Sequence, residues 1–190
     1  MRLSCQNMEN LVQKLSRHLF SEEGANVFAV LDGASVPDLL ASLRERQPEY
    51  ICLYRGELKP DIAEVAPYLV RLETDAEFTS WLLGKGWGKH WGIFALTFAD
   101  LPEMRRHLRS FLTVYSEEGK PMLFRYYDPR VLRVYLPTCT DAELVKVFGP
   151  IEAFLLEDEK PQMLLRLRAP AGLLKQERIA LSEDQAAPAV

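Results

Sequence analysis

The segment NVFAVLDG, residues 26–33, carries the strongest information about the fold. It contains a continuous apolar run at 27–31 and ends in an Asp-Gly step typical of a turn. A strand with one face in water alternates apolar and polar residues, and this run does not alternate. The stretch therefore predicts a central strand with both faces covered by helices, which places the chain in the α/β class.

The residues on either side of this strand predict a helix before it and a helix after it. The first helix is expected at 7–20, and Ser35 with Asp38 three residues later predicts the start of the second. A further apolar strand follows at 50–56. Because strand–helix–strand crossovers usually join parallel neighbours, we expect the strands 27–31 and 50–56 to pair in parallel.

A proline-containing connector at 56–67 separates this unit from a second set of elements. Its predicted strands are 68–73, 90–98, a hairpin within 113–127 that turns at Glu118-Gly119, and an antiparallel pair at 151–158 and 162–169. Polar residues of the capping type predict where its helices begin: Thr74 with Glu77, Asp100 with Glu103, Asp128 before Pro129, and Thr140 with Glu143.

The expected architecture is an α/β protein of two closely packed lobes. Residues 1–66 would form a small N-terminal β-α-β lobe, and residues 67–168 a larger C-terminal lobe with a mixed sheet and flanking helices. Residues 169–190 end in the polar sequence LSEDQAAPAV and are predicted to be a flexible tail.

Composition narrows the class of protein. Hydrophobic residues make up 48% and charged residues 26% of the chain, which is the balance of a folded globular domain. The net charge of −4 argues against a duplex-binding protein. The polar N-terminus lacks the apolar core of a secretory signal, and no apolar run is long enough to span a bilayer. The three scattered cysteines indicate reduced thiols, so we expect a cytoplasmic protein without a membrane partner.

The catalytic candidates are weak at the level of sequence. His90 lies between two tryptophans in a glycine-rich segment, and an enzyme with a groove around Asp32, His90 and Asp128 is one alternative. However, no nucleophile, partner acid or metal-ligand spacing accompanies His90. We therefore expect no catalytic residue, no cofactor and no metal.

The arginine-rich segments leave a further alternative open. Arg105, Arg106 and Arg109 on one predicted helix could join the arginines of LFRYYDPRVLRVYLP, residues 123–137, in a basic patch. Tyrosines of the same stretch could stack bases, which would make the protein an accessory nucleic-acid-binding module. Tyr126 and Tyr127 are expected on opposite faces of a strand, which weakens such a platform. A basic patch that recognises an acidic protein surface stays open.

Several ordered segments carry a resemblance to a known family. They are VFAVLDGA (27–34), EVAPYLVRLE (64–73), HWGI (90–93), FRYYDPRVL (124–132) and FGPI (148–151). They resemble segments of the type VI secretion effector chaperones, also called adaptor proteins of the Tap/Tec type, and the resemblance as a whole runs from about residue 15 to 158. The resemblance implies a cytoplasmic, non-enzymatic protein without a cofactor. Such a protein would bind a cognate effector toxin and help to load it onto the spike protein VgrG.

This resemblance gives the stretch 123–137 a role in an interface. Asp128 is expected to cap a helix and to attract neighbouring arginines, so that Arg125, Asp128 and Pro129 form a structural latch with Arg130. Arginine and aromatic residues are enriched in protein interfaces. The expected partner-binding residues are accordingly Arg130, Arg133, Tyr127 and Trp91.

Overall fold

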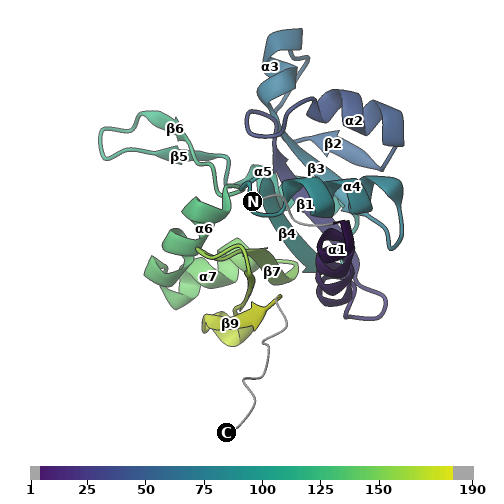
Figure 1. The fold of residues 1–190 in the computed structure, drawn as a ribbon. Helices are drawn as coiled ribbons and strands as arrows, with labels where there is room; N and C mark the ends of the chain where they lie inside the picture. The colour runs from purple at the N-terminus through teal and green to yellow at the C-terminus, as the bar shows by residue number, and fades with distance from the viewer. Residues whose placement is uncertain (1–4, 182–190) are drawn as a thin grey trace, which may run out of the picture.

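A seven-stranded antiparallel sheet forms the centre of the molecule in this computed structural model, which describes residues 5–181 (Figure 1). Its strand order is β2-β3-β1-β4-β7-β8-β9. The strands are β1 (Asn26–Asp32), β2 (Tyr50–Cys52), β3 (Pro67–Leu72), β4 (Gly92–Thr97), β7 (Ile151–Glu157), β8 (Met163–Arg168) and β9 (Lys175–Ala180). Two further strands, β5 (Thr113–Tyr115) and β6 (Pro121–Leu123), form a separate hairpin.

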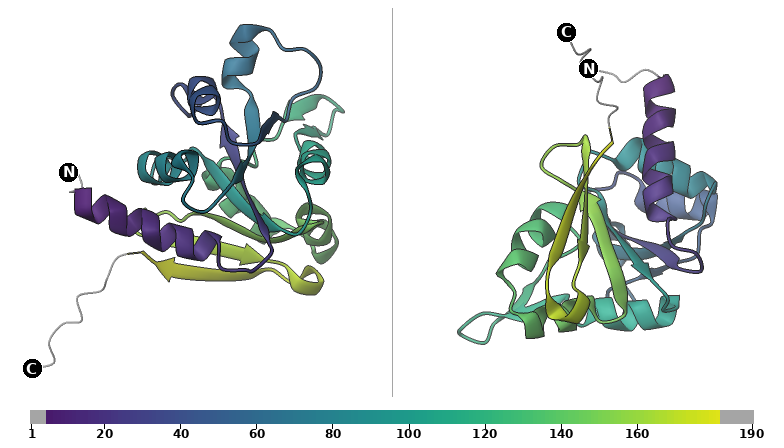
Figure 2. Two further views of the ribbon diagram at one scale, coloured as in Figure 1. Left: turned by 90° about the vertical axis from the view of Figure 1, so that its right-hand side faces the viewer. Right: turned by 90° about the horizontal axis from the view of Figure 1, so that it is seen from below.

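Helices cover both faces of the sheet (Figure 2). One face carries α1 (Cys5–Leu19), α2 (Leu39–Arg46) and α4 (Glu77–Gly86). The other carries α5 (Leu101–Arg109), α6 (Pro129–Tyr135) and α7 (Asp141–Phe148). The short helix α3 (Pro60–Val65) lies in the connection between β2 and β3, and the 3₁₀ turns are η1 (Leu136–Thr138) and η2 (Pro170–Gly172).

The strand β1 has the two buried faces that its sequence predicts. Ala29 and Leu31 pack in the core beneath α1, α2 and α4, whereas Phe28 and Val30 pack in the core beneath α5, α6 and α7. Since successive side chains of a strand point to opposite faces, a strand between two helical layers must be apolar at every position. The predicted α/β class with flanking helices is confirmed.

The predicted parallel pairing of the first two strands is wrong. β3 lies between β1 and β2 and pairs antiparallel with both, with Leu69 opposite Val30 on one side and Ile51 on the other. β3 is buried along most of its length, so its backbone groups need a partner strand on each edge. Every ladder of the large sheet is antiparallel, which also differs from the mixed sheet expected for the second lobe.

The two predicted lobes share this one sheet. β1 and β2 come from residues 1–66, and β3, the first strand after that boundary, is inserted between them. The boundary at residue 66 stays a prediction about which parts fold independently.

The predicted flexible tail is wrong for its first part. Residues 175–180 form β9, which pairs with β8 along its whole length, including Leu164 opposite Ile179. Most side chains of β9 are exposed, because it is the last strand of the sheet and its outer surface faces water. Because β9 is mostly polar, it lacks the apolar pattern from which a strand is predicted. Residues 182–190 of the predicted tail lie outside the described residues.

Some of the predicted helix caps are present in the structure and others are not. Asp100 accepts a hydrogen bond from the backbone N–H of Glu103, and Thr140 with Glu143 forms a complete capping box. The predicted boxes at Ser35 and Thr74 are wrong, because α2 begins after Asp38 and α4 begins after Ala76, in both cases without a side-chain cap. The predicted hairpin is confirmed as β5–β6.

Candidate partner-binding surface

One edge of the sheet gathers buried carboxylates and exposed cations. β1 ends there, β4 begins there and β7 ends there, because neighbouring strands run antiparallel. We call this set the charged edge, and it consists of Asp32, His90, Arg125, Asp128, Arg130 and Glu157. The three carboxylates are buried, whereas the side chains of Arg125 and Arg130 are exposed and that of His90 is half-buried.

Asp32 joins the end of β1 to the loop that follows the hairpin. Its carboxylate accepts hydrogen bonds from the backbone N–H of Ala34 at 3.1 Å, from the hydroxyl of Ser35 at 2.7 Å and from the guanidinium of Arg125. The Asp32 side chain is 2% exposed and the Arg125 side chain 44% exposed. The hydrogen bond to Asp32 raises the pKa of Arg125. The latch thus differs from the prediction, because Arg125 pairs with Asp32 and not with Asp128.

Asp128 caps α6 and holds Arg130 in a two-pronged ion pair. Its Oδ1 accepts from the backbone N–H and from Nε of Arg130, both at 2.9 Å, and its Oδ2 accepts from Nη2 at 2.7 Å. Pro129 is the first residue of the helix, where its missing N–H is not needed. Burial alone would raise the pKa of Asp128, but its hydrogen bonds and ion pair with Arg130 outweigh burial and lower it. These are the contacts expected of a latch, although that role stays a prediction.

His90 lies over the buried carboxylate of Glu157. Its Nδ1 is 2.8 Å from Oε2 of Glu157 without hydrogen-bond alignment, and its backbone N–H donates to the same carboxylate at 3.2 Å. The backbone of His90 adopts φ = 57°, in the left-handed region that costs strain for a residue with a side chain. Burial raises the pKa of Glu157, although His90 acts in the opposite direction.

The alternative of an enzyme groove draws on Asp32, His90 and Asp128, and the fold does bring these residues to one edge. Asp32 and Asp128 are already paired with Arg125 and Arg130, and the His90 ring lies against the carboxylate of Glu157. Two of these contacts, Asp32 with Arg125 and His90 with Glu157, join distant segments of the chain, and the guanidinium groups of Arg125 and Arg130 are partly exposed. Among residues 5–181, no three His, Cys, Asp or Glu side chains gather as metal ligands would.

The four expected partner-binding residues differ in their exposure to solvent. Arg130 is exposed, and Arg133 is half-buried with Nη1 donating to the backbone carbonyl of Glu157 at 3.0 Å. Trp91 and Tyr127 are buried in the two cores, so their prediction as surface anchors is wrong.

The prediction that Tyr126 and Tyr127 point to opposite faces of a strand is wrong. Both side chains lie in the same core. Residues 124–128 form a turn and not a strand, and the rings of Tyr126 and Tyr127 lie 5.6 Å apart beneath α5 and α6. The hydroxyl of Tyr126 donates to the backbone carbonyl of Leu108. Neither ring is available to stack a base, which removes the predicted platform from the nucleic-acid alternative.

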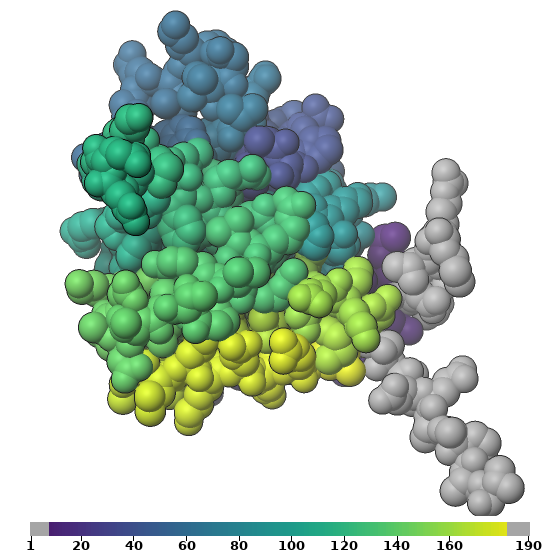
Figure 3. All heavy atoms as spheres, turned by 90° about the vertical axis from the view of Figure 1, so that its left-hand side faces the viewer, coloured from purple at the N-terminus to yellow at the C-terminus, as the bar shows by residue number. Residues whose placement is uncertain are grey.

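The hairpin β5–β6 is the feature that sequence reasoning located but did not recognise as a surface. We call residues 113–123 the hairpin arm. It projects from the body of the molecule (Figure 1) and lies on the side that faces the viewer in Figure 3, and all its strand residues are exposed. Four of these residues are large and apolar: Val114, Tyr115, Met122 and Leu123. The sequence shows only two short strands with apolar residues around a turn, and a two-stranded hairpin cannot cover such residues by itself.

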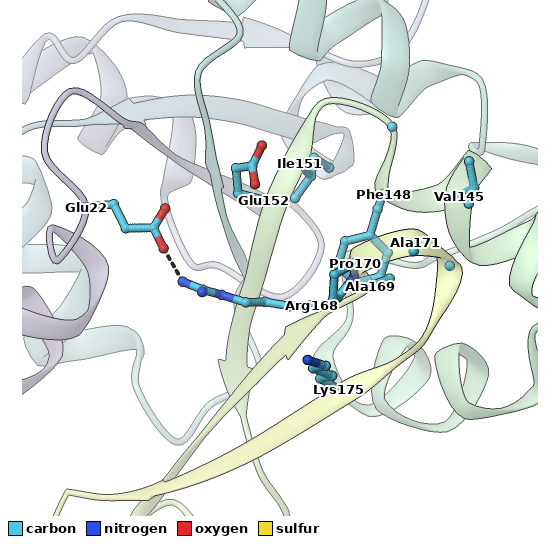
Figure 4. Close-up of a pocket in the computed structure, with 12 residues that line it drawn as sticks. Glu22, Val145, Phe148, Ile151, Glu152, Arg168, Ala169, Pro170, Ala171 and Lys175 are labelled. Atoms are coloured by element: carbon cyan, nitrogen blue, oxygen red, sulfur yellow. Dashed lines mark hydrogen bonds and ion pairs between the residues drawn. The ribbon is translucent and has the colours of Figure 1, made fainter.

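A surface pocket of about 580 Å³ lies between α7, β7, β8 and η2 (Figure 4). Its charged side chains include Arg168, which points toward Glu22 and forms an ion pair with it. Much of the remaining wall consists of small residues of the 169–172 segment, where Ala171 and Gly172 have positive φ. The residues that line the pocket include no pair of a nucleophile and a base, and Arg168 is already paired with Glu22.

The fold and the surface together define an α/β protein with helices on both sides of an antiparallel sheet, an ion-paired edge and a projecting apolar arm. Residues 27–146, from β1 into α7, match the family DUF4123, a domain of unknown function. The chain belongs to this family. No curated protein matches the chain, and neither does any solved structure. Within residues 5–181, no helix has the length and apolar character needed to cross a bilayer.

Proposed function

We propose that this protein is a non-enzymatic adaptor that binds a type VI secretion effector toxin in the cytoplasm and helps to load it onto the VgrG spike. Membership of DUF4123 supports the proposal, since the motifs that resemble the effector chaperones lie largely within the matched region. Those motifs form the scaffold: VFAVLDGA contains most of β1, HWGI leads into β4, and FRYYDPRVL carries the turn and the start of α6. Nucleic acid and membrane are not part of the proposal.

The observation that carries the proposal is the hairpin arm. An isolated two-stranded hairpin with exposed apolar side chains is a costly feature in a soluble protein, because it leaves both apolar surface and strand edges in water. Exposed aromatic residues and methionine are enriched where proteins meet. Tyr115 is 71% exposed, and the exposed Arg125 follows the arm closely in the chain. An apolar arm with a cation near its base suits a protein partner.

The arm has two faces that can be tested separately. Val114 lies opposite Met122 on one face, whereas Tyr115 and Leu123 belong to the other. The double variants V114T/M122T and Y115T/L123T each remove apolar area from one face and keep β-branched residues in the strands. The matched control is V134T/V145T, which changes two exposed valines on α6 and α7.

An adaptor gene is expected beside the gene of its toxin, so the assay is co-purification of each variant with the product of such a neighbouring gene, followed by a binding titration. We expect at least one arm variant to weaken toxin binding by about tenfold or more, as loss of interface anchors does. The control should bind as the parent protein does, and circular dichroism should show that all variants are folded. Toxin binding unchanged in both arm variants would place the interface elsewhere. A parent protein that never captures the toxin would refute the adaptor function.

A further inference from the structure

A second surface, which shares no residue with the charged edge, concentrates positive charge. A groove of about 560 Å³ runs between β2 and α5. Four arginines line it: Arg55 after β2, and Arg105, Arg106 and Arg109 on α5. Ile51, Leu101 and Pro102 supply the apolar part of its wall.

The arginines of this groove have no counterion in the part of the chain that the structure describes. No carboxylate in residues 5–181 lies within ion-pair distance of any of the four, although the whole chain has 27 acidic and 23 basic residues. The charged edge shows the opposite arrangement, in which each cation is paired. Arg105 and Arg109 are also four residues apart on α5, a spacing at which like charges destabilise a helix. Burial lowers the pKa of Arg109, and the positive charges of Arg105 and Arg55 lower it further.

The groove is held in place before any ligand arrives. Nε of Arg105 donates to the backbone carbonyl of Cys52 at 3.3 Å, which ties α5 to β2. Met104 and Leu108 are buried on the opposite side of α5, and Asp100 caps its N-terminus. A groove lined by one sign of charge on a rigid helix concentrates field and attracts the opposite charge.

We propose that this groove binds an acidic stretch of a partner polypeptide. Carboxylates of the stretch would pair with the guanidinium groups, which suit planar anions, and its apolar side chains would lie against Ile51, Leu101 and Pro102. Nucleic acid fits less well, because the net charge of the chain is −4 and the groove has no aromatic residue on which a base could stack.

The probe is a fluorescein-labelled peptide of alternating glutamate and leucine, measured by anisotropy against the full chain. The same peptide with glutamine in place of glutamate tests charge, a labelled oligothymidylate tests nucleic acid, and inorganic phosphate serves as a competitor. The variant is R55Q/R106Q, because both side chains are exposed and neither makes a side-chain hydrogen bond within residues 5–181. K146Q/K160Q removes the same charge from exposed positions elsewhere and is the matched control.

We expect the glutamate peptide to bind at least tenfold more tightly than the glutamine peptide. R55Q/R106Q should lose about tenfold in affinity, and the control should stay within about twofold of the parent protein. The inference is overturned by an absence of saturable binding, by equal losses in variant and control, or by tighter binding of the oligothymidylate at the same arginines. Complete displacement by millimolar phosphate would reduce the site to a general anion site and also overturn it. The inference is independent of the adaptor proposal, since arm variants should leave peptide binding unchanged.

Discussion

The contact between Asp32 and Arg125 offers the sharpest test of the charged edge. It joins two segments that are 93 residues apart in the chain. A hydrogen bond to a charged group is worth about 1.5–3 kcal/mol when well buried. Arg125 is 44% exposed, so solvent screening reduces the expected coupling energy to about 1 kcal/mol. Replacing Asp32 by alanine should cost more, about 3 kcal/mol, because Ala34 and Ser35 lose their acceptor as well.

The measurement is a double-mutant cycle of D32A, R125M and the double variant, with urea unfolding followed by circular dichroism. The double variant should cost about 1 kcal/mol less than the sum of the single costs. Glu49 and Arg71 provide a matched control, since that arginine is also 44% exposed but its carboxylate is 53% exposed and 3.4 Å away. The control pair should show a coupling of about 0.2 kcal/mol or less. Additive costs for Asp32 and Arg125 would show that the contact does not hold the two segments together.

Two further predictions concern single positions. In G92A the new Cβ would lie 2.2 Å from the backbone carbonyl oxygen of Val30, so we expect about 3 kcal/mol or more of destabilisation in thermal melts. G84A in α4 is its control, since a Cβ there makes ordinary contacts with Val12 and Met8 of α1 and should stabilise by about 0.5–1 kcal/mol. Equal effects of the two substitutions would contradict the close pairing of β4 with β1. The pKa of Asp128 is lowered on folding, so its carboxylate stabilises the protein above its ordinary pKa of 3.8, and this stability is lost as pH falls through the folded-state pKa. Urea unfolding of D128N should therefore show its full cost at pH 7 and a shrinking cost below pH 3.8, whereas a cost independent of pH would exclude the charge as its cause.

Parts of the candidate surface were open to prediction because their contacts are local. Asp128 and Arg130 are two residues apart, and the Asp-Pro step that starts α6 is visible in the sequence. The partners of Arg125 and His90 could not be predicted from the sequence, because Asp32 is 93 residues from Arg125 and Glu157 is 67 residues from His90. The exposure of the hairpin arm also escaped prediction, since a short apolar strand has the same pattern whether or not another element covers it.

The amino-acid sequence was enough to predict the α/β class, the central position of β1, the hairpin and the caps of α5, α6 and α7. Each of these depends on residues within one or two turns of chain, where spacing and capping chemistry act directly. Only the tertiary structure decided that β3 separates β1 from β2, that residues 175–180 complete the sheet, and that Trp91 and Tyr127 are buried. Those outcomes depend on which distant strands pair and which distant apolar surfaces pack together. A strand can form its hydrogen bonds with any suitable neighbour, and its own sequence does not specify which neighbour that is.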